Sequence, residues 1–150
     1  MKTIKGLDHI GIRVTDFKRA VGFYEQLGFE IVRMDLKERI IVLLHKSGVV
    51  LNLLDSAIKI HRVRNVLMDE TIKYAGYTHI AFRVTDIEQA IQYIRMLELT
   101  ITEGPVTFGD GKTSIFIRDP DRNVIEFTQP LLEHATQSDV LKQGSLETIE

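Results

Sequence analysis

The stretch LDHIGIRVTDFKRAVGFYEQLGF, residues 7–29, is matched seventy positions later by YTHIAFRVTDIEQAIQYIRMLEL, residues 77–99. Aligned without gaps at that offset, residues 7–31 and 77–101 are identical at nine of 25 positions. A match of this extent over a whole supersecondary unit indicates an internal duplication. The chain is therefore expected to build two copies of one structural unit.

Each copy predicts a strand that runs into a helix. Apolar residues alternate with other residues at Ile10, Ile12 and Val14, as in a strand with one buried face. Asp16 and Asp86 stand where a helix N-cap belongs, and Gly28 stands where the first helix should end. The apolar stripes predicted for the helices are Phe17, Ala20, Val21, Tyr24 and Leu27, and Ile87, Ala90, Ile91, Ile94 and Leu97.

Three further strands are expected after each helix, so that each half is a βαβββ module. In the first half they are residues 29–36, 39–45 and 48–54, with a turn at 46–48. In the second half a loop at 103–112 leads into TSIFIR, residues 113–118, and the turn DPDRN, residues 119–123, leads into VIEFTQ. We predict an α+β fold with one domain over 1–130, comprising modules 4–55 and 77–130 and a linker 56–76, followed by a tail 131–150.

The composition of the chain excludes several classes of function. The 150 residues carry 19 basic and 21 acidic side chains, a net charge of −2, and no basic cluster with interleaved aromatics, which argues against nucleic-acid binding. The most apolar stretch, residues 40–54, is too short and interrupted to span a bilayer, and the start MKTIKG lacks the apolar segment of a signal peptide. Without cysteine, a disulfide, a thiolate ligand and a cysteine nucleophile are excluded. We expect a cytoplasmic protein with no membrane partner.

The strand alternation places both repeated histidines away from the aliphatic core. His9 and Arg13 share the face opposite Ile10 and Ile12, with Gly11 between them, because side chains alternate along a strand. In the second copy His79, Ala81 and Arg83 occupy the equivalent face. A histidine beside a small residue, with an arginine further along, is typical of the lining of a concave site. The arginines are candidates for binding an anionic substrate or for pairing with an acidic residue at a strand end.

The last strand of the second half adds a carboxylate. Glu126 alternates with Ile125 and Phe127, and a carboxylate in an apolar strand is costly unless a metal ion, an arginine or solvent compensates its charge. Asn52 holds the equivalent position at an offset of 74, with the four extra residues assigned to the loop 103–112. Asn52 is a weak ligand or a non-ligand polar residue. Two imidazoles and one carboxylate suit Fe(II), Mn(II), Ni(II) or Zn(II), and open positions favour Fe(II).

The paired modules, with DHIGIRVTD, FYEQLGF, THIAFRV and RDPDRNVIEF, resemble the vicinal oxygen chelate superfamily over residues 4–130. That superfamily includes glyoxalase I, bleomycin- and fosfomycin-resistance proteins, methylmalonyl-CoA epimerase and extradiol dioxygenases. The segment at 103–127 looks especially like glyoxalase-domain proteins related to dihydroxybiphenyl dioxygenases. The resemblance implies a U-shaped mixed sheet, or cup, with helices outside, a divalent metal inside it, and a homodimer. It places metal ligands on His9, His79 and Glu126, and a fourth position, normally glutamate, on Asn52.

This resemblance implies a metal-dependent enzyme that binds a small substrate through two adjacent oxygens. A dioxygenase is favoured because three ligands leave positions for a diol and oxygen. A glyoxalase-like lyase, in which Glu126 moves a proton, is the first alternative, and Asn52 weakens it. A fosfomycin-type transferase also uses two histidines and a glutamate. A non-catalytic binding protein of the bleomycin-resistance type is the alternative from another class, and such binders usually lack the metal residues.

Overall fold

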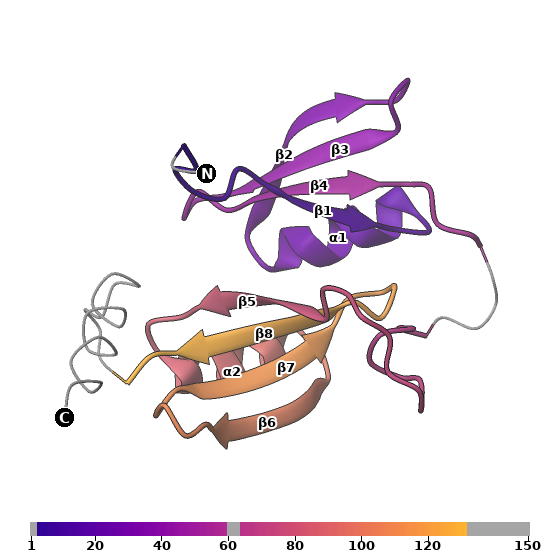
Figure 1. The fold of residues 1–150 in the computed structure, drawn as a ribbon. Helices are drawn as coiled ribbons and strands as arrows, with labels where there is room; N and C mark the ends of the chain where they lie inside the picture. Colours follow the sequence, from indigo (N-terminus) through magenta and orange to yellow (C-terminus); the bar gives the residue numbers. More distant parts are fainter. Residues whose placement is uncertain (1–2, 60–63, 132–150) are drawn as a thin grey trace. The chain divides into compact units, whose positions relative to one another are not determined.

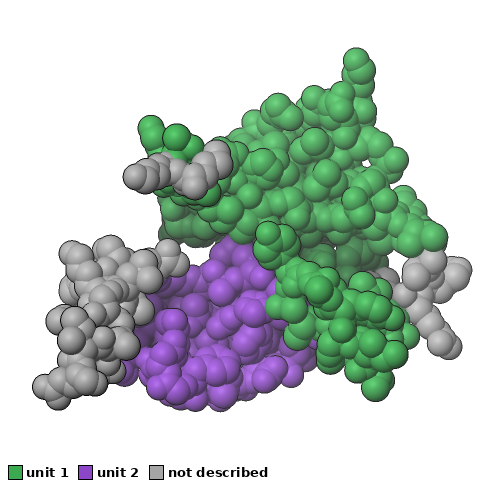
Figure 2. All heavy atoms as spheres, viewed as in Figure 1, with its two compact units in different colours: residues 1–78, 119–123 green, residues 79–118, 124–150 purple. Residues whose placement is uncertain are grey.

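The computed structural model describes residues 3–59 and 64–131, and it divides into two compact units (Figures 1 and 2). The first unit comprises residues 1–78 together with 119–123, and the second comprises 79–118 and 124–150. Almost all of the predicted tail, from residue 132 onward, lies outside the described residues. Over the described part of the chain, no helix is long and apolar enough to cross a membrane.

Each unit contains one helix and one four-stranded mixed sheet, which confirms the predicted α+β class. The first unit contains β1 (Ile10–Arg13), α1 (Phe17–Gln26), β2 (Phe29–Asp35), β3 (Ile40–His45) and β4 (Val50–Leu54). The second contains β5 (His79–Arg83), α2 (Ile87–Met96), β6 (Ile101–Thr107), β7 (Thr113–Arg118) and β8 (Val124–Gln129). The sheet orders, β1-β4-β3-β2 and β5-β8-β7-β6, are the same, so the duplication in sequence is a duplication in topology.

The helices begin and end as their sequences predict. The side chains of Asp16 and Asp86 accept hydrogen bonds from the backbone N–H groups three residues on, as N-cap residues do. Gly28 follows the C-cap of α1 with φ at +87°, a conformation that favours glycine. The equivalent position after α2 is Glu98, with φ at +57°, so the second helix ends in the same conformation without the glycine signal.

Each helix packs on one face of its own sheet (Figure 1). The predicted apolar stripes supply most of the buried helix residues, and Phe23 is an additional one. On the sheets, Leu43, Leu51 and Leu53 in the first unit and Ile115, Ile117 and Ile125 in the second are at most 1% exposed. This burial fixes the opposite faces, which carry the candidate site residues.

The predicted loop at 103–112 is wrong in its first half, because β6 continues through Glu103 and Pro105 to Thr107. Pro105 is tolerated there because β6 is an edge strand, and the pairing with β7 shifts register twice along it. The assignment of the four extra residues is confirmed. Ile31 pairs with Leu43 and Ile101 with Ile117, so the offset rises from 70 (101 − 31) to 74 (117 − 43) between these strands.

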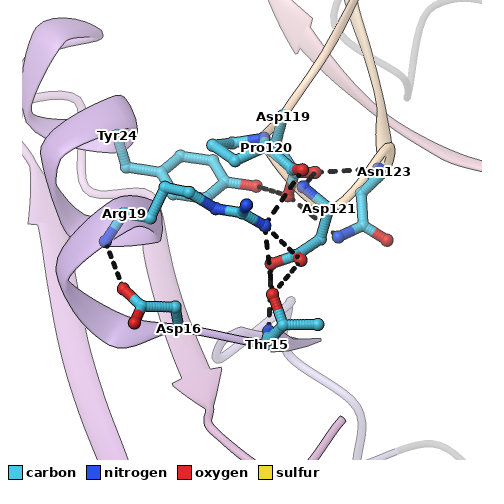
Figure 3. A network of polar contacts seen from close by, with 8 residues as sticks. All are labelled: Thr15, Asp16, Arg19, Tyr24, Asp119, Pro120, Asp121 and Asn123. Atoms are coloured by element: carbon cyan, nitrogen blue, oxygen red, sulfur yellow. Dashed lines mark hydrogen bonds and ion pairs between the residues drawn. The ribbon is translucent and has the colours of Figure 1, made fainter. Parts of the chain in front are cut away.

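The turn between β7 and β8, residues 119–123, groups with the first unit because it forms polar contacts with α1 and the residue before its N-cap (Figure 3). The Asp121 carboxylate accepts hydrogen bonds from the backbone N–H of Thr15 at 3.1 Å and from the Thr15 hydroxyl. It also forms an ion pair with Arg19 at 3.0 Å. These contacts join positions more than 100 residues apart in the sequence.

Asp119 in the same turn is a buried carboxyl, 3% exposed, held by four donors. The Tyr24 hydroxyl donates to it at 3.0 Å, as do the side chain and backbone of Asn123, both at 2.8 Å, and the backbone of Asp121 at 2.9 Å. Burial raises the pKa of Asp119 above its ordinary value. Burial, and then the nearby charge of Asp119, raises the pKa of Tyr24 well above that of a free tyrosine.

Candidate active site

The second unit brings together two of the predicted metal ligands. In the parallel pairing of β5 and β8, Ala81 lies opposite Glu126, so His79 and Glu126 project from the same face of the sheet. His79 Nε2 lies 3.0 Å from Glu126 Oε2. The two side chains are 37% and 12% exposed, so this is a half-buried pair with one side open to solvent.

The face opposite α2 is defined by the strand registers. Among its residues are His79, Ala81 and Arg83 on β5, Glu126 and Thr128 on β8, and Ser114 and Phe116 on β7. Ser114 Oγ donates a hydrogen bond to Glu126 Oε1 at 2.6 Å. The ring of Phe116 meets the His79 imidazole edge to face, with the centroids 6.1 Å apart. Glu126 therefore has a separate partner for each carboxylate oxygen.

The first unit has the same strand pairing, with an amide in the place of the carboxylate. Gly11 lies opposite Asn52 in the parallel pairing of β1 and β4, as Ala81 lies opposite Glu126. The equivalence of Asn52 and Glu126, predicted from the offset of 74, is thereby confirmed. The Asn52 Oδ1 atom is buried and has no hydrogen-bond partner among the residues that the structure describes. A buried amide oxygen without a protein partner is costly unless a water molecule or a ligand donates a hydrogen bond to it.

His9 comes directly before β1, and its side chain is 45% exposed. Its Nδ1 atom lies 2.7 Å from the carboxylate of Asp8. A carboxylate accepts hydrogen bonds, so Nδ1 carries the proton of this bond, and Nε2 is the unprotonated nitrogen of the neutral imidazole. Histidine ligands of metals are commonly oriented by a carboxylate in this way.

The arginines and the remaining described histidine occupy distinct environments. Arg13 Nε donates to Ser56 Oγ at 3.1 Å, and Arg83 is exposed on the face opposite α2. His45 pairs with Phe29 across β2 and β3 and shares the helix-facing side of the sheet with the buried Leu43. His45 therefore projects from the opposite side of the sheet to Asn52.

The donors of the second unit fit a divalent metal ion. Metal–ligand distances of about 2.1 Å for an imidazole nitrogen and a carboxylate oxygen, at a right angle, place the two donor atoms about 3 Å apart. The His79–Glu126 separation of 3.0 Å has this value. Within each unit, the described residues contain no group of three or more histidine, cysteine, aspartate or glutamate side chains that could hold a metal. A complete site therefore needs a ligand beyond this pair.

Ser114 and Phe116 are the residues that the sequence prediction missed. Their signal was present in TSIFIR, where they alternate with the buried Ile115 and Ile117. Only the pairing of β7 with β8, however, places them beside Glu126.

Comparison with known proteins finds relatives that are similar in sequence and others that are similar in structure. A metallothiol transferase FosB from Staphylococcus haemolyticus is 29% identical over 132 residues, 87% of either chain. The crystal structure of virulence protein STM3117 from Salmonella typhimurium is 29% identical with a TM-score of 0.63, covering 85% of this chain and 98% of that one. A lactoylglutathione lyase from Agrobacterium tumefaciens has a TM-score of 0.64 at 20% identity, covering 89% and 99% of the two chains, which shows a shared fold.

The profile of the Glyoxalase/Bleomycin resistance protein/Dioxygenase superfamily matches residues 6–127, which make up most of the chain. The paired βαβββ modules, their sheet order and the equivalent positions of Asn52 and Glu126 agree with that match. The chain therefore belongs to the Glyoxalase/Bleomycin resistance protein/Dioxygenase superfamily, as the repeated motifs predicted.

Proposed function

We propose that this protein is a metal-dependent enzyme that acts on a small substrate through two neighbouring oxygens, with the metal held by His9, His79 and Glu126. The observation that carries the proposal is the His79–Glu126 pair, 3.0 Å apart on one face of the second sheet. His9 precedes β1 as His79 begins β5, and its Nδ1 is engaged by a carboxylate, which supports it as the third ligand. His9 comes from the same chain or from a second copy.

His9, His79 and Glu126 would hold the divalent metal, which would supply Lewis-acid chemistry at the two substrate oxygens. Glu126 would supply the anionic donor, and in the glyoxalase-like alternative it would leave the metal transiently and take a proton from the substrate. The exposed Arg13 and Arg83 are candidates to bind an anionic part of the substrate. Phe116 places an apolar ring against the His79 imidazole, with the centroids 6.1 Å apart.

The reaction that the donor set favours is oxygen-dependent. Two imidazoles and one carboxylate leave open coordination positions, as in non-haem Fe(II) oxygenases. Asn52, in the position equivalent to Glu126, supplies a neutral amide and disfavours a glyoxalase reaction with two carboxylates. A binding protein without catalysis would not need the three donors that this chain retains.

Thiol transfer to an oxygen-rich small molecule is a second candidate, because the FosB relative is named a metallothiol transferase and matches over 87% of both chains. Two histidines and one glutamate also serve that chemistry. The two reactions are separated by co-substrate. A dioxygenase consumes oxygen with catechols, whereas a transferase consumes a low-molecular-weight thiol with fosfomycin and needs no oxygen.

The test is metal content and activity of protein purified without oxygen and reconstituted with Fe(II), Mn(II), Ni(II) or Zn(II). The wild type should hold close to one metal per chain, and His79→Ala and Glu126→Gln should lose it. His45→Ala is the matched control, because His45 projects from the helix-facing side of its sheet. Retention of stoichiometric metal by both site variants would refute the proposed ligands. Oxygen uptake, thiol loss and turnover of a glutathione–methylglyoxal adduct would then assign the reaction.

A further inference from the structure

Glu126 differs from an ordinary surface glutamate in that one of its oxygens is bonded to a fully buried hydroxyl. Ser114 is 0% exposed, and its Oγ–H donates to Glu126 Oε1 at 2.6 Å. This distance lies within the range of short hydrogen bonds between a hydroxyl and a carboxylate. We propose that Ser114 is a positioning residue that holds Oε1 of Glu126, so that Oε2 faces the His79 imidazole and the metal; this inference rests on the proposed function.

The need for such a residue follows from the freedom of a glutamate side chain. Its terminal torsion has a broad, roughly two-fold profile, so an unrestrained carboxylate presents either oxygen, or both, to a metal. With Oε1 bonded to Ser114, Oε2 is the oxygen that lies 3.0 Å from His79 Nε2. Ser114 therefore selects a one-oxygen mode of coordination and reduces the conformational freedom lost on metal binding.

The first unit provides an internal comparison. In β7 and β8, Ser114 pairs with Thr128, next to the pair formed by Phe116 and Glu126. The equivalent pair in β3 and β4 is Ile40 with Leu54, next to the pair formed by Val42 and Asn52. Beside the Glu126 carboxylate stand Ser114, which bonds to it, and Thr128, whose buried hydroxyl has no partner among the described residues. Beside the neutral amide of Asn52 both neighbours are aliphatic.

This difference is informative because the two sheets are otherwise built alike. Burying a hydroxyl without a function is unfavourable, and the aliphatic pair in the first sheet shows that this fold accepts apolar residues at these positions. The Ser114 hydroxyl is satisfied by the Glu126 carboxylate. We therefore assign the hydroxyl to the carboxylate rather than to the folding of the sheet.

The experiment is a metal titration of metal-free protein with Mn(II) and with Zn(II), comparing wild type, Ser114→Ala, Ser114→Thr and Thr113→Ala. Thr113→Ala is the matched control: Thr113 is the neighbouring residue on β7, and its hydroxyl bonds to Thr107 at 3.0 Å. Ser114→Ala should weaken metal binding by about 10–100-fold, the usual effect of removing a hydrogen bond to a metal ligand. Thr113→Ala should bind as wild type, and Ser114→Thr should restore binding if its extra methyl group fits.

A spectroscopic readout keeps the test decisive if the threonine does not fit. The visible spectrum of the Co(II) form, which reports coordination number, should change in Ser114→Ala and not in Thr113→Ala.

Two negative results are distinguishable. If Glu126→Gln abolishes metal binding while Ser114→Ala binds as tightly as wild type, the positioning role is refuted and the proposed function stands. If Glu126→Gln itself leaves metal binding unchanged, the metal site is refuted and the role of Ser114 with it. Equal losses of affinity in Ser114→Ala and Thr113→Ala would show a general effect on the sheet and would also overturn the inference.

Discussion

Replacing Tyr24 by phenylalanine removes one of the four donors to the buried carboxyl of Asp119 and leaves the aromatic ring in place (Figure 3). Tyr24 is 0% exposed and Asp119 is 3% exposed, so water does not readily replace the lost hydroxyl. The loss should also raise the pKa of Asp119 further, because the Tyr24 hydrogen bond opposes the effect of burial. The substitution therefore tests whether the turn 119–123 is held to the first unit by these bonds.

The magnitude follows from the kind of bond. A hydrogen bond to a charged group contributes about 1.5–3 kcal/mol to the free energy of unfolding. In a domain of this size each kcal/mol shifts the melting temperature by about 2–4 °C, so Tyr24→Phe should lower it by roughly 3–12 °C at neutral pH. Tyr77→Phe is the control, since Tyr77 is fully exposed, and it should leave the melting temperature unchanged.

The contribution of Tyr24 to the free energy of unfolding should also depend on pH in the alkaline range. The pKa of Tyr24 is raised well above its ordinary value of 10.0, first by burial and then by the charge of Asp119. Above pH 10 the unfolded tyrosine loses its proton while the folded one keeps it. The stability that Tyr24 contributes is thus complete below pH 10 and is lost as the pH rises further, at up to about 1.4 kcal/mol per pH unit.

The assay is chemical denaturation of wild type, Tyr24→Phe and Tyr77→Phe between pH 7 and pH 11.5. The wild type should exceed Tyr24→Phe by the largest margin at neutral pH, and the margin should shrink above pH 10. The reasoning is refuted if Tyr24→Phe is as stable as wild type at pH 7, or if the margin is constant up to pH 11.5.

Two further substitutions address the turn and the edge strand. Asp121→Ala removes a carboxylate that is 8% exposed and bonded to Thr15 and Arg19. It should lower the free energy of unfolding by about 2–3 kcal/mol, less than for a fully buried ion pair because Arg19 is half-exposed. A loss below about 0.5 kcal/mol in urea denaturation would contradict the assigned contacts. Gly104→Ala should cost at least about 2 kcal/mol, because φ is +93° and the new Cβ would lie 2.5 Å from the backbone oxygen of Ser114. Gly109→Ala is the control: nothing lies within 4 Å of its new Cβ, so it should change the free energy of unfolding by less than about 0.5 kcal/mol. Equal effects of the two glycine variants would refute the close approach of β6 to β7.

The parts of the fold that could be predicted from the sequence are those with local or periodic signals. Asp16 and Asp86 are N-caps as expected, because capping involves residues only three positions apart. The equivalence of Asn52 and Glu126 could be predicted because strand alternation fixes the face of each residue and the repeat fixes its position. The superfamily followed from the same repeated motifs.

The parts that could not be predicted depend on distant pairings. The bond between Tyr24 and Asp119 joins residues 95 positions apart, and no local pattern links them. Glycine and proline at 104 and 105 indicate a loop, yet an edge strand accepts both. The strand pattern around Ser114 does not indicate its partner, because only the register of β7 against β8 places its hydroxyl beside Glu126.

The central claim is that His79 and Glu126 bind a divalent metal with His9. Anomalous diffraction at the absorption edge of the bound metal, from crystals of reconstituted protein, tests it most directly. The account predicts one strong peak about 2.0–2.2 Å from His79 Nε2 and Glu126 Oε2, with His9 of the same or a second chain completing the ligands. A peak elsewhere, or no peak beside His79 and Glu126 in protein shown to contain metal, would contradict it.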